Sequence, residues 1–195
     1  MSSRLVILIS GNGSNLQAIL DACADKTLPA SVVAVISNKP DAYGLIRAKN
    51  AGVEAVYFSK LENEPRRDYD SRLAAYVSTC LPDYVILAGW MRLLSSNFLS
   101  SFPNRVINLH PALPGTFPGT HAIERAFESF QRGEIDHSGV MVHLVPNEGV
   151  DDGPTLATQE IPFQSGESLE QFEARVHEVE HWLLVETLKN MVSGK

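Results

Sequence analysis

The chain has 195 residues, of which 44% are hydrophobic and 20% are charged, so it has the composition of an ordinary globular protein and enough residues to bury a full core. Its formal net charge of −7 argues against a surface for nucleic acids or anionic membranes, although local N–H donors can still bind the phosphate of a small molecule. No apolar run approaches the roughly 20 residues of a membrane helix, and nothing near Arg4 resembles a signal peptide. We therefore expect a cytoplasmic protein that binds no membrane.

The cysteines and histidines lack the spacing of a metal site. Cys23 and Cys80 each lie in a segment with helical periodicity, and neither belongs to a CxxC pattern. We interpret both as reduced packing residues of a cytosolic protein. His177 and His181 share one face of a helix, but no third ligand accompanies them, so we expect no metal.

The first expected element is a strand at residues 4–9, because a continuous apolar run is typical of a central parallel strand covered on both faces. A loop with Gly11 and Gly13 follows, and apolar residues recur at helical spacing from Leu16. Such loops bind phosphate because glycines let the backbone approach an anion and the helix presents free N–H groups. The third glycine of a dinucleotide pattern would fall at Leu16, and the Lys of a Walker pattern is missing. The loop therefore serves either the single phosphate of a small molecule or only a tight turn.

Strands and helices then alternate, which predicts a parallel sheet wound with right-handed crossovers. We expect strands at residues 31–37, 53–58 and 83–88, and helices at residues 42–51 and 65–80. The apolar segment 90–94 follows the end of a strand. It either packs in the core or lines a pocket for a flat aromatic ligand.

Two polar side chains stand at the end of the next strand. This strand runs from Arg105 to Leu109 and stops against a stretch rich in proline and glycine at residues 111–119. Ligands of open α/β sheets bind at the carboxyl ends of strands, and Asn108 and His110 point to the same side of an extended chain. They could hold an oxyanion and manage one proton. The alternative is that Asn108 only makes the local hydrogen bonds of a turn and that His110 is a capping or half-buried histidine.

The remaining elements predict that the sheet gains antiparallel strands. A helix at residues 121–132 precedes a strand at 137–145, a turn at 146–154 and a strand that ends at Ile161, with no helix between the two strands. A closing helix at residues 169–191 begins with a capping box of Ser168 and Gln171. We therefore predict an α/β, Rossmann-like, mostly parallel twisted sheet with helices on both faces and antiparallel character in the C-terminal half.

A pair of carboxylates lies in the turn between these two strands. Asp151 and Asp152 are flanked by glycines, where Asp commonly makes local hydrogen bonds. A carboxylate near His110 would instead stabilise its imidazolium form and raise its pKa, as a general acid near neutral pH requires.

Seven motifs together indicate a family. They are residues 9–19, 36–39, 87–94, 107–111 (Ile-Asn-Leu-His-Pro), 142–143, 150–154 (Val-Asp-Asp-Gly-Pro) and 180–181. The motifs span nearly the whole chain. In their residues and their order, the sequence resembles the phosphoribosylglycinamide formyltransferases, folate-dependent enzymes of purine biosynthesis. The resemblance implies transfer of a formyl group from 10-formyltetrahydrofolate to the amine of N1-(5-phosphoribosyl)glycinamide.

The resemblance also implies residue roles. The implied catalytic residues are Asn108, His110 and Asp151. Those implied to bind the substrate phosphate and ribose are Gly13, Ser14, Asn15 and Glu180; those implied to contact folate are Arg66, Met91, Arg92, Leu93, Leu94 and Asn108. One formyltransferase domain would span residues 1–195, with a phosphate-binding half at 1–104 and a catalytic, folate-binding half at 105–195.

Two segments depart from the family's pattern. Residues 112–117 differ from the usual sequence after His-Pro, and the segment before Val150 is one residue longer, which leaves either Asp151 or Asp152 facing His110; we choose Asp151. The alternatives are a 10-formyltetrahydrofolate hydrolase and a non-catalytic folate- or nucleotide-binding module of the same fold. We expect small molecules, not nucleic acid, as partners of a monomer or homodimer.

Overall fold

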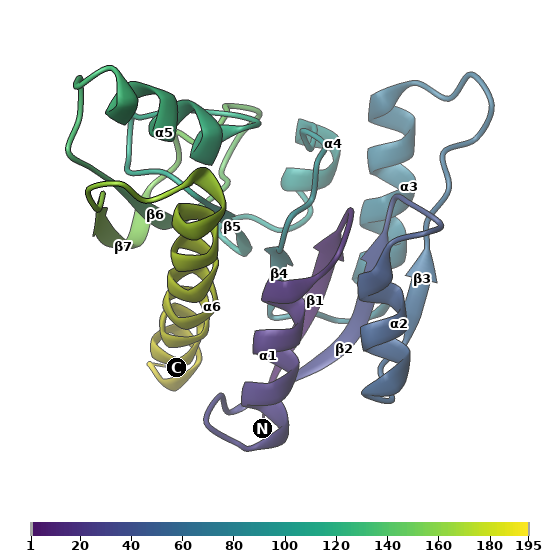
Figure 1. Cartoon of the computed structure of the whole chain (residues 1–195). Helices are drawn as coiled ribbons and strands as arrows, with labels where there is room; N and C mark the ends of the chain where they lie inside the picture. The colour runs from purple at the N-terminus through teal and green to yellow at the C-terminus, as the bar shows by residue number, and fades with distance from the viewer. Residues whose placement is uncertain (1, 195) are drawn as a thin grey trace.

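The computed structural model describes residues 2–194, which form a seven-stranded sheet in the order β3-β2-β1-β4-β5-β6-β7 (Figure 1). Strands β1 to β5 are parallel, whereas β6 pairs antiparallel with both β5 and β7. The strands are β1 Ser3–Ile9, β2 Ala30–Ser37, β3 Ala55–Tyr57, β4 Tyr84–Leu87, β5 Val106–His110, β6 His137–Leu144 and β7 Thr155–Pro162. This topology confirms the predicted fold class.

Helices cover both faces of the sheet. They are α1 Ser14–Ala24, α2 Tyr43–Asn50, α3 Arg66–Thr79, α4 Ser96–Leu99, α5 Ala122–Gln131 and α6 Leu169–Ser193. Helices α1, α2, α5 and α6 share one hydrophobic core with the sheet, while α3 and α4 belong to a second core on the opposite face. Helices α1 and α6 pack against each other (Figure 1), so the first and last helices of the chain meet on one face.

The alternation of side chains along β1 explains its continuous apolar sequence. Leu5, Ile7 and Ile9 belong to the first core, and Val6 and Leu8 to the second. All five side chains are fully buried. A strand with a core on each face needs apolar residues at every position, as the sequence predicted.

Several element boundaries differ from expectation. Strand β3 has only three residues, so the predicted strand at residues 53–58 is too long, and the single-turn helix α4 was not expected. The capping box of α6 is confirmed, with Ser168 accepting from the N–H of Gln171 and the Gln171 side chain accepting from the N–H of Ser168. Between residues 2 and 194, no helix is long and apolar enough to cross a membrane.

Ser10 ties together the loops at the carboxyl ends of three neighbouring strands. Its hydroxyl donates to Asn38 Oδ1 after β2 at 2.7 Å and accepts from the N–H of Met91 after β4 at 2.8 Å. Its own N–H donates to the carbonyl of Gly89 at 3.0 Å. The glycine loop after β1 is therefore held beside segment 90–94, at the edge where β5 presents Asn108 and His110.

Candidate active site

Four polar side chains from β5, β6 and the loop between β6 and β7 form one cluster. Residue pairing between the antiparallel strands places Asn108 opposite His143. Asp151 Oδ1 accepts from Asn108 Nδ2 at 3.0 Å, and Asp151 Oδ2 lies 3.4 Å from His110 Nδ1. The structure thus brings together the three predicted catalytic residues and adds His143, which belongs to one of the seven motifs but was given no role there.

The orientation of the Asn108 amide follows from its two neighbours. His143 Nδ1 lies 2.9 Å from the carbonyl of Leu144, which can only accept, so Nδ1 carries the hydrogen of the neutral ring. His143 Nε2 then has a free lone pair and accepts from Asn108 Nδ2 at 3.1 Å. Both amide hydrogens of Asn108 are therefore engaged, one by His143 and one by Asp151.

His110 is oriented to accept a proton. Its Nε2 lies 3.1 Å from the carbonyl of Phe117 and must carry a hydrogen, which leaves Nδ1, facing Asp151, as the unprotonated nitrogen of the neutral ring. Burial lowers the pKa of His110 below its ordinary value, and the negative charge of Asp151 only partly opposes this effect. The charge of Asp151 does raise the pKa of His110, as expected of a nearby carboxylate, but the net shift is downward because burial has the larger effect.

Asp151 is held ionised in a constrained loop. Burial alone would raise its pKa, but three effects together bring the pKa below its ordinary value: a hydrogen bond from His143 Nε2, 3.5 Å from Oδ1, when that ring is protonated, the N–H of Gly119, and the charges of the two imidazoles in their protonated forms. The N–H of Gly119 donates to Oδ2 at 2.8 Å. Asp152 is exposed, so of the two adjacent carboxylates it is Asp151 that lies against His110.

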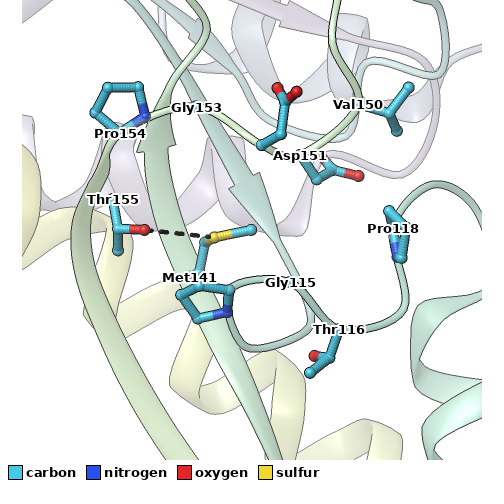
Figure 2. A pocket seen from close by; sticks show the side chains of 11 residues that line it. Gly115, Thr116, Pro118, Met141, Val150, Asp151, Gly153, Pro154 and Thr155 are labelled. Atoms are coloured by element: carbon cyan, nitrogen blue, oxygen red, sulfur yellow. Dashed lines mark hydrogen bonds between the residues drawn. The ribbon is translucent and has the colours of Figure 1, made fainter.

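A cavity of about 660 Å³ lies beside Asp151. Its walls come from the loop after β5, from β6 and from the turn into β7, and Figure 2 shows Met141 and Thr155 on one side and Thr116 and Pro118 on the other. The space is large enough for part of a small organic ligand. The cluster of Asn108, His110, His143 and Asp151, called the reactive cluster below for its predicted role, therefore borders a cavity.

The glycine loop is closely packed against α2. Gly13 has φ +76°, and a Cβ on Gly13 would lie 2.9 Å from the Cα of Gly44. The N–H of Gly44 also donates to the carbonyl of Gly11 at 3.1 Å. Only glycine fits at position 13, so this loop is a close-packed entry into α1 and presents the N–H groups of Ser14 and Asn15 in the helix's first turn.

A cluster of polar side chains lies where α1 meets α6. Glu180 is buried, and its Oε2 accepts from Asn15 Nδ2 at 3.5 Å and from His177 Nδ1 at 2.7 Å. The carboxylate raises the pKa of His177. Among the described residues, Asn15 Oδ1 and His181 Nε2 are buried without a hydrogen-bond partner. His177 was considered above only as a metal ligand; its spacing of three residues from Glu180 on a helix was the available signal.

The residues predicted to contact folate have different environments. Leu94 is buried in the core, whereas Met91 is 68% and Leu93 48% exposed. The Arg92 guanidinium lies 4.4 Å from the ring centroid of Tyr69. Segment 90–94 thus divides between core packing and an exposed apolar surface.

Arg66 lies at the start of α3 and forms an ion pair with Glu148. Glu148 also accepts from the N–H of Ser96 at 2.9 Å, so it anchors the loop that carries Asp151 to α3 and α4.

No group of three or more His, Cys, Asp or Glu side chains within residues 2–194 is arranged to hold a metal ion.

Comparisons with known proteins cover the whole chain. The family model described as formyl transferase matches residues 3–188. The chain is 46% identical to a phosphoribosylglycinamide formyltransferase of Dictyostelium discoideum, over 97% of this chain and 98% of that protein. It is 44% identical to the one of Schizosaccharomyces pombe, over 99% of each chain. The crystal structure of glycinamide ribonucleotide transformylase 1 from Symbiobacterium toebii superimposes with a TM-score of 0.92 at 38% identity, over 99% of this chain and 89% of that one.

Proposed function

The chain belongs to the formyl transferase family, and we propose that it transfers the formyl group of 10-formyltetrahydrofolate to the amine of N1-(5-phosphoribosyl)glycinamide in de novo purine biosynthesis. The observation that carries this proposal is the cluster of Asn108, His110 and Asp151 beside a cavity at the carboxyl end of β5. Whole-chain similarity to phosphoribosylglycinamide formyltransferases supports this reaction over a hydrolase or a non-catalytic module.

The reaction needs alignment and charge stabilisation rather than an enzyme nucleophile. The substrate amine attacks the formyl carbon, a new C–N bond forms, and the bond from that carbon to the folate nitrogen breaks. The amine loses one proton and the folate nitrogen gains one. Neutral His110 accepts the amine proton at Nδ1, and the resulting imidazolium, stabilised by Asp151, returns it to the leaving nitrogen.

Asn108 stabilises the negative oxygen of the tetrahedral intermediate. Because both of its amide hydrogens are engaged, this role requires one of them to turn from His143 or Asp151 towards the oxyanion. An anionic oxygen is a stronger acceptor than the neutral imidazole nitrogen of His143, so exchange of that bond is favoured. Removing such a donor typically slows the chemical step about 100- to 1,000-fold.

The phosphorylated substrate lies where α1 meets α6. The N–H groups of Gly13, Ser14 and Asn15 bind its phosphate at the positive end of the α1 helix dipole. Glu180 accepts hydrogen bonds from the ribose hydroxyls. The unpartnered Asn15 Oδ1 supports a further contact with a hydroxyl donor of the substrate.

The folate contacts the edge formed by segment 90–94, Asn108 and Arg66. The exposed side chains of Met91 and Leu93 supply apolar surface for its ring system. Arg92 and the buried Leu94 shape the wall behind that surface. The guanidinium of Arg66, which pairs with a carboxylate in this structure, provides the charge for an acidic group of the folate.

The two halves of the chain act as a single cytoplasmic domain over residues 1–195. Residues 1–104 contribute the phosphate-binding half and residues 105–195 the catalytic, folate-binding half. The packing of α1 on α6 and the hydrophobic core shared by both halves support this organisation. Its partners are small molecules, and light scattering would distinguish a monomer from a homodimer.

The test is an optical assay of deformylation of 10-formyl-5,8-dideazafolate with and without the glycinamide ribonucleotide. Deformylation that requires the acceptor is the expected result, and His110→Ala should abolish most of it while the protein stays folded. Folate turnover without the acceptor would instead identify a hydrolase. Folate binding with no turnover would identify a binding module.

A further inference from the structure

The loop after β5, residues 111–120, completes the reactive cluster with two backbone groups. The carbonyl of Phe117 accepts from His110 Nε2 at 3.1 Å, and the N–H of Gly119 donates to Asp151 Oδ2 at 2.8 Å. The protonation states of both side chains therefore depend on the conformation of this loop.

The loop adopts a backbone that cannot be held by local preference alone. Phe117 has φ +45°, a left-handed conformation that is rare for a bulky residue, and Gly115 and Gly119 also have positive φ. His121, the N-cap of α5, is left-handed as well, with φ +57°. Such conformations persist only when surrounding contacts impose them, and a catalytic loop is a common place for them.

Arg125 of α5 supplies those contacts. Its Nη2 lies 2.7 Å from the carbonyl oxygens of Phe117 and Pro118 and 2.9 Å from that of Thr120. Its Nε donates to the carbonyl of His121 at 3.3 Å. Four carbonyl oxygens thus converge on one guanidinium, whose charge offsets the repulsion between their dipoles.

The Phe117 carbonyl joins Arg125 to the catalytic histidine. A carbonyl oxygen has two lone pairs, and here one accepts from His110 Nε2 and the other from Arg125 Nη2. We propose that Arg125 is a positioning residue of the reaction, which fixes the loop 111–120 and, through the shared carbonyl, holds the His110 ring with its Nε2 hydrogen on Phe117 and its Nδ1 towards Asp151.

The charges that face His110 agree with this role. Asp151 of the β6–β7 loop and the Phe117 carbonyl favour the protonated ring, whereas the charges of His143 on β6 and Arg125 on α5 disfavour it. Burial is the largest effect and also lowers the pKa of His110. Removing the positive charge of Arg125 should therefore raise this pKa.

The proposal rests on the proposed reaction for its kinetic consequences, but the state of His110 can be measured without turnover. Three variants of the whole protein are compared: Arg125→Gln, Arg125→Lys and, as a control at the opposite end of α5, Arg132→Gln. Arg132 is exposed and pairs with Glu134, away from the cluster. Circular dichroism and a thermal melt establish that each variant folds.

The first measurement is the NMR titration of the His110 ring. We expect its pKa to rise in Arg125→Gln and to stay near the wild-type value in Arg125→Lys, which keeps the charge but loses the planar fork of donors. Arg132→Gln should titrate like the wild type. An unchanged His110 pKa in Arg125→Gln would overturn the electrostatic part of the proposal.

The second measurement is the pH profile of kcat/KM with the acceptor present. We expect kcat to fall by up to about 100-fold in both Arg125 variants, because a small misplacement of a reacting group can slow catalysis that much. The acid limb of kcat/KM should move to higher pH only in Arg125→Gln. Kinetics equal to those of Arg132→Gln would refute the positioning role. Wild-type turnover that needs no acceptor would instead refute the proposed function and leave the titration result standing.

Discussion

Replacement of Asp151 by Asn is the sharpest test of the reactive cluster. The variant keeps the shape of the side chain, and Asn tolerates the left-handed backbone at this position, where φ is +53°. Alanine would add backbone strain to the loss of the carboxylate. Asp151→Asn therefore isolates the effect of charge and hydrogen bonding.

The size of the effect follows from the partners of the two carboxylate oxygens. One oxygen accepts from Asn108 Nδ2 and the other from the N–H of Gly119. The side-chain amide of the variant has one oxygen and one NH₂ group, so it can accept from only one of these two donors. The other donor then faces the NH₂ group, which destabilises the fold by about 1–3 kcal/mol. The His110 imidazolium also loses its counter-charge, and the lost proton transfer should slow turnover on the order of 100- to 10,000-fold.

The assay compares Asp151→Asn with Asp152→Asn, its exposed neighbour in sequence, in acceptor-dependent deformylation. Asp152→Asn should turn over at close to the wild-type rate. Because the charge of Asp151 raises the pKa of His110, that pKa should fall further in Asp151→Asn. The reasoning fails if Asp152→Asn is the slower enzyme, or if folded Asp151→Asn loses less than about tenfold in rate.

The ionised form of Asp151 also links folding to pH. Its pKa in the folded chain lies below the ordinary value of 3.8, so its contribution to the free energy of unfolding is present above that pH and disappears as pH falls through the folded-state pKa. The stability difference between wild type and Asp151→Asn should therefore shrink in acid. Urea unfolding at neutral pH and near pH 3 measures it.

Three further changes test the fold and the proposed site of the phosphorylated substrate. Gly13→Ala should lower the free energy of unfolding by at least about 1–2 kcal/mol in urea unfolding, since its Cβ would also meet Gly44, and should raise KM for the phosphorylated acceptor. Glu180→Gln should raise KM for the same acceptor with little change for folate in steady-state kinetics, and should lower the pKa of His177 in an NMR titration, because the carboxylate raises it. Ser168→Ala should cost about 1 kcal/mol of stability in urea unfolding without changing kcat, because it removes only the cap of α6.

Features with a local cause could be predicted from the sequence. The apolar run of β1 required a core on both sides, and Ser168 with Gln171 marked the start of α6 by residues three apart. The placement of Asn108 and His110 at the end of a strand also followed from neighbouring residues. Each of these features is decided within a few residues, where propensity and periodicity are informative.

Features decided by tertiary contacts could not be predicted in this way. His143 enters the cluster because the antiparallel register sets it opposite Asn108, and no local pattern encodes that register. The net direction of the His110 pKa depends on how deeply the ring is buried, which the motif does not reveal. The short helix α4 lies over the second core, and its Phe98 is buried there by residues distant in the chain.

Some residues of the cluster are positioned by the sheet and others by two loops. Asn108, His110 and His143 stand on paired strands, whose backbone hydrogen bonds hold them in place. Asp151 stands on a loop, and the N–H of Gly119 from the other loop is one of the groups that fix it. A change in either loop that moves Asp151 therefore changes its distance from His110 even when no strand residue moves. This is why substitutions remote from the reacting atoms, at loop anchors rather than in the sheet, should be the ones that shift the pH dependence of the reaction.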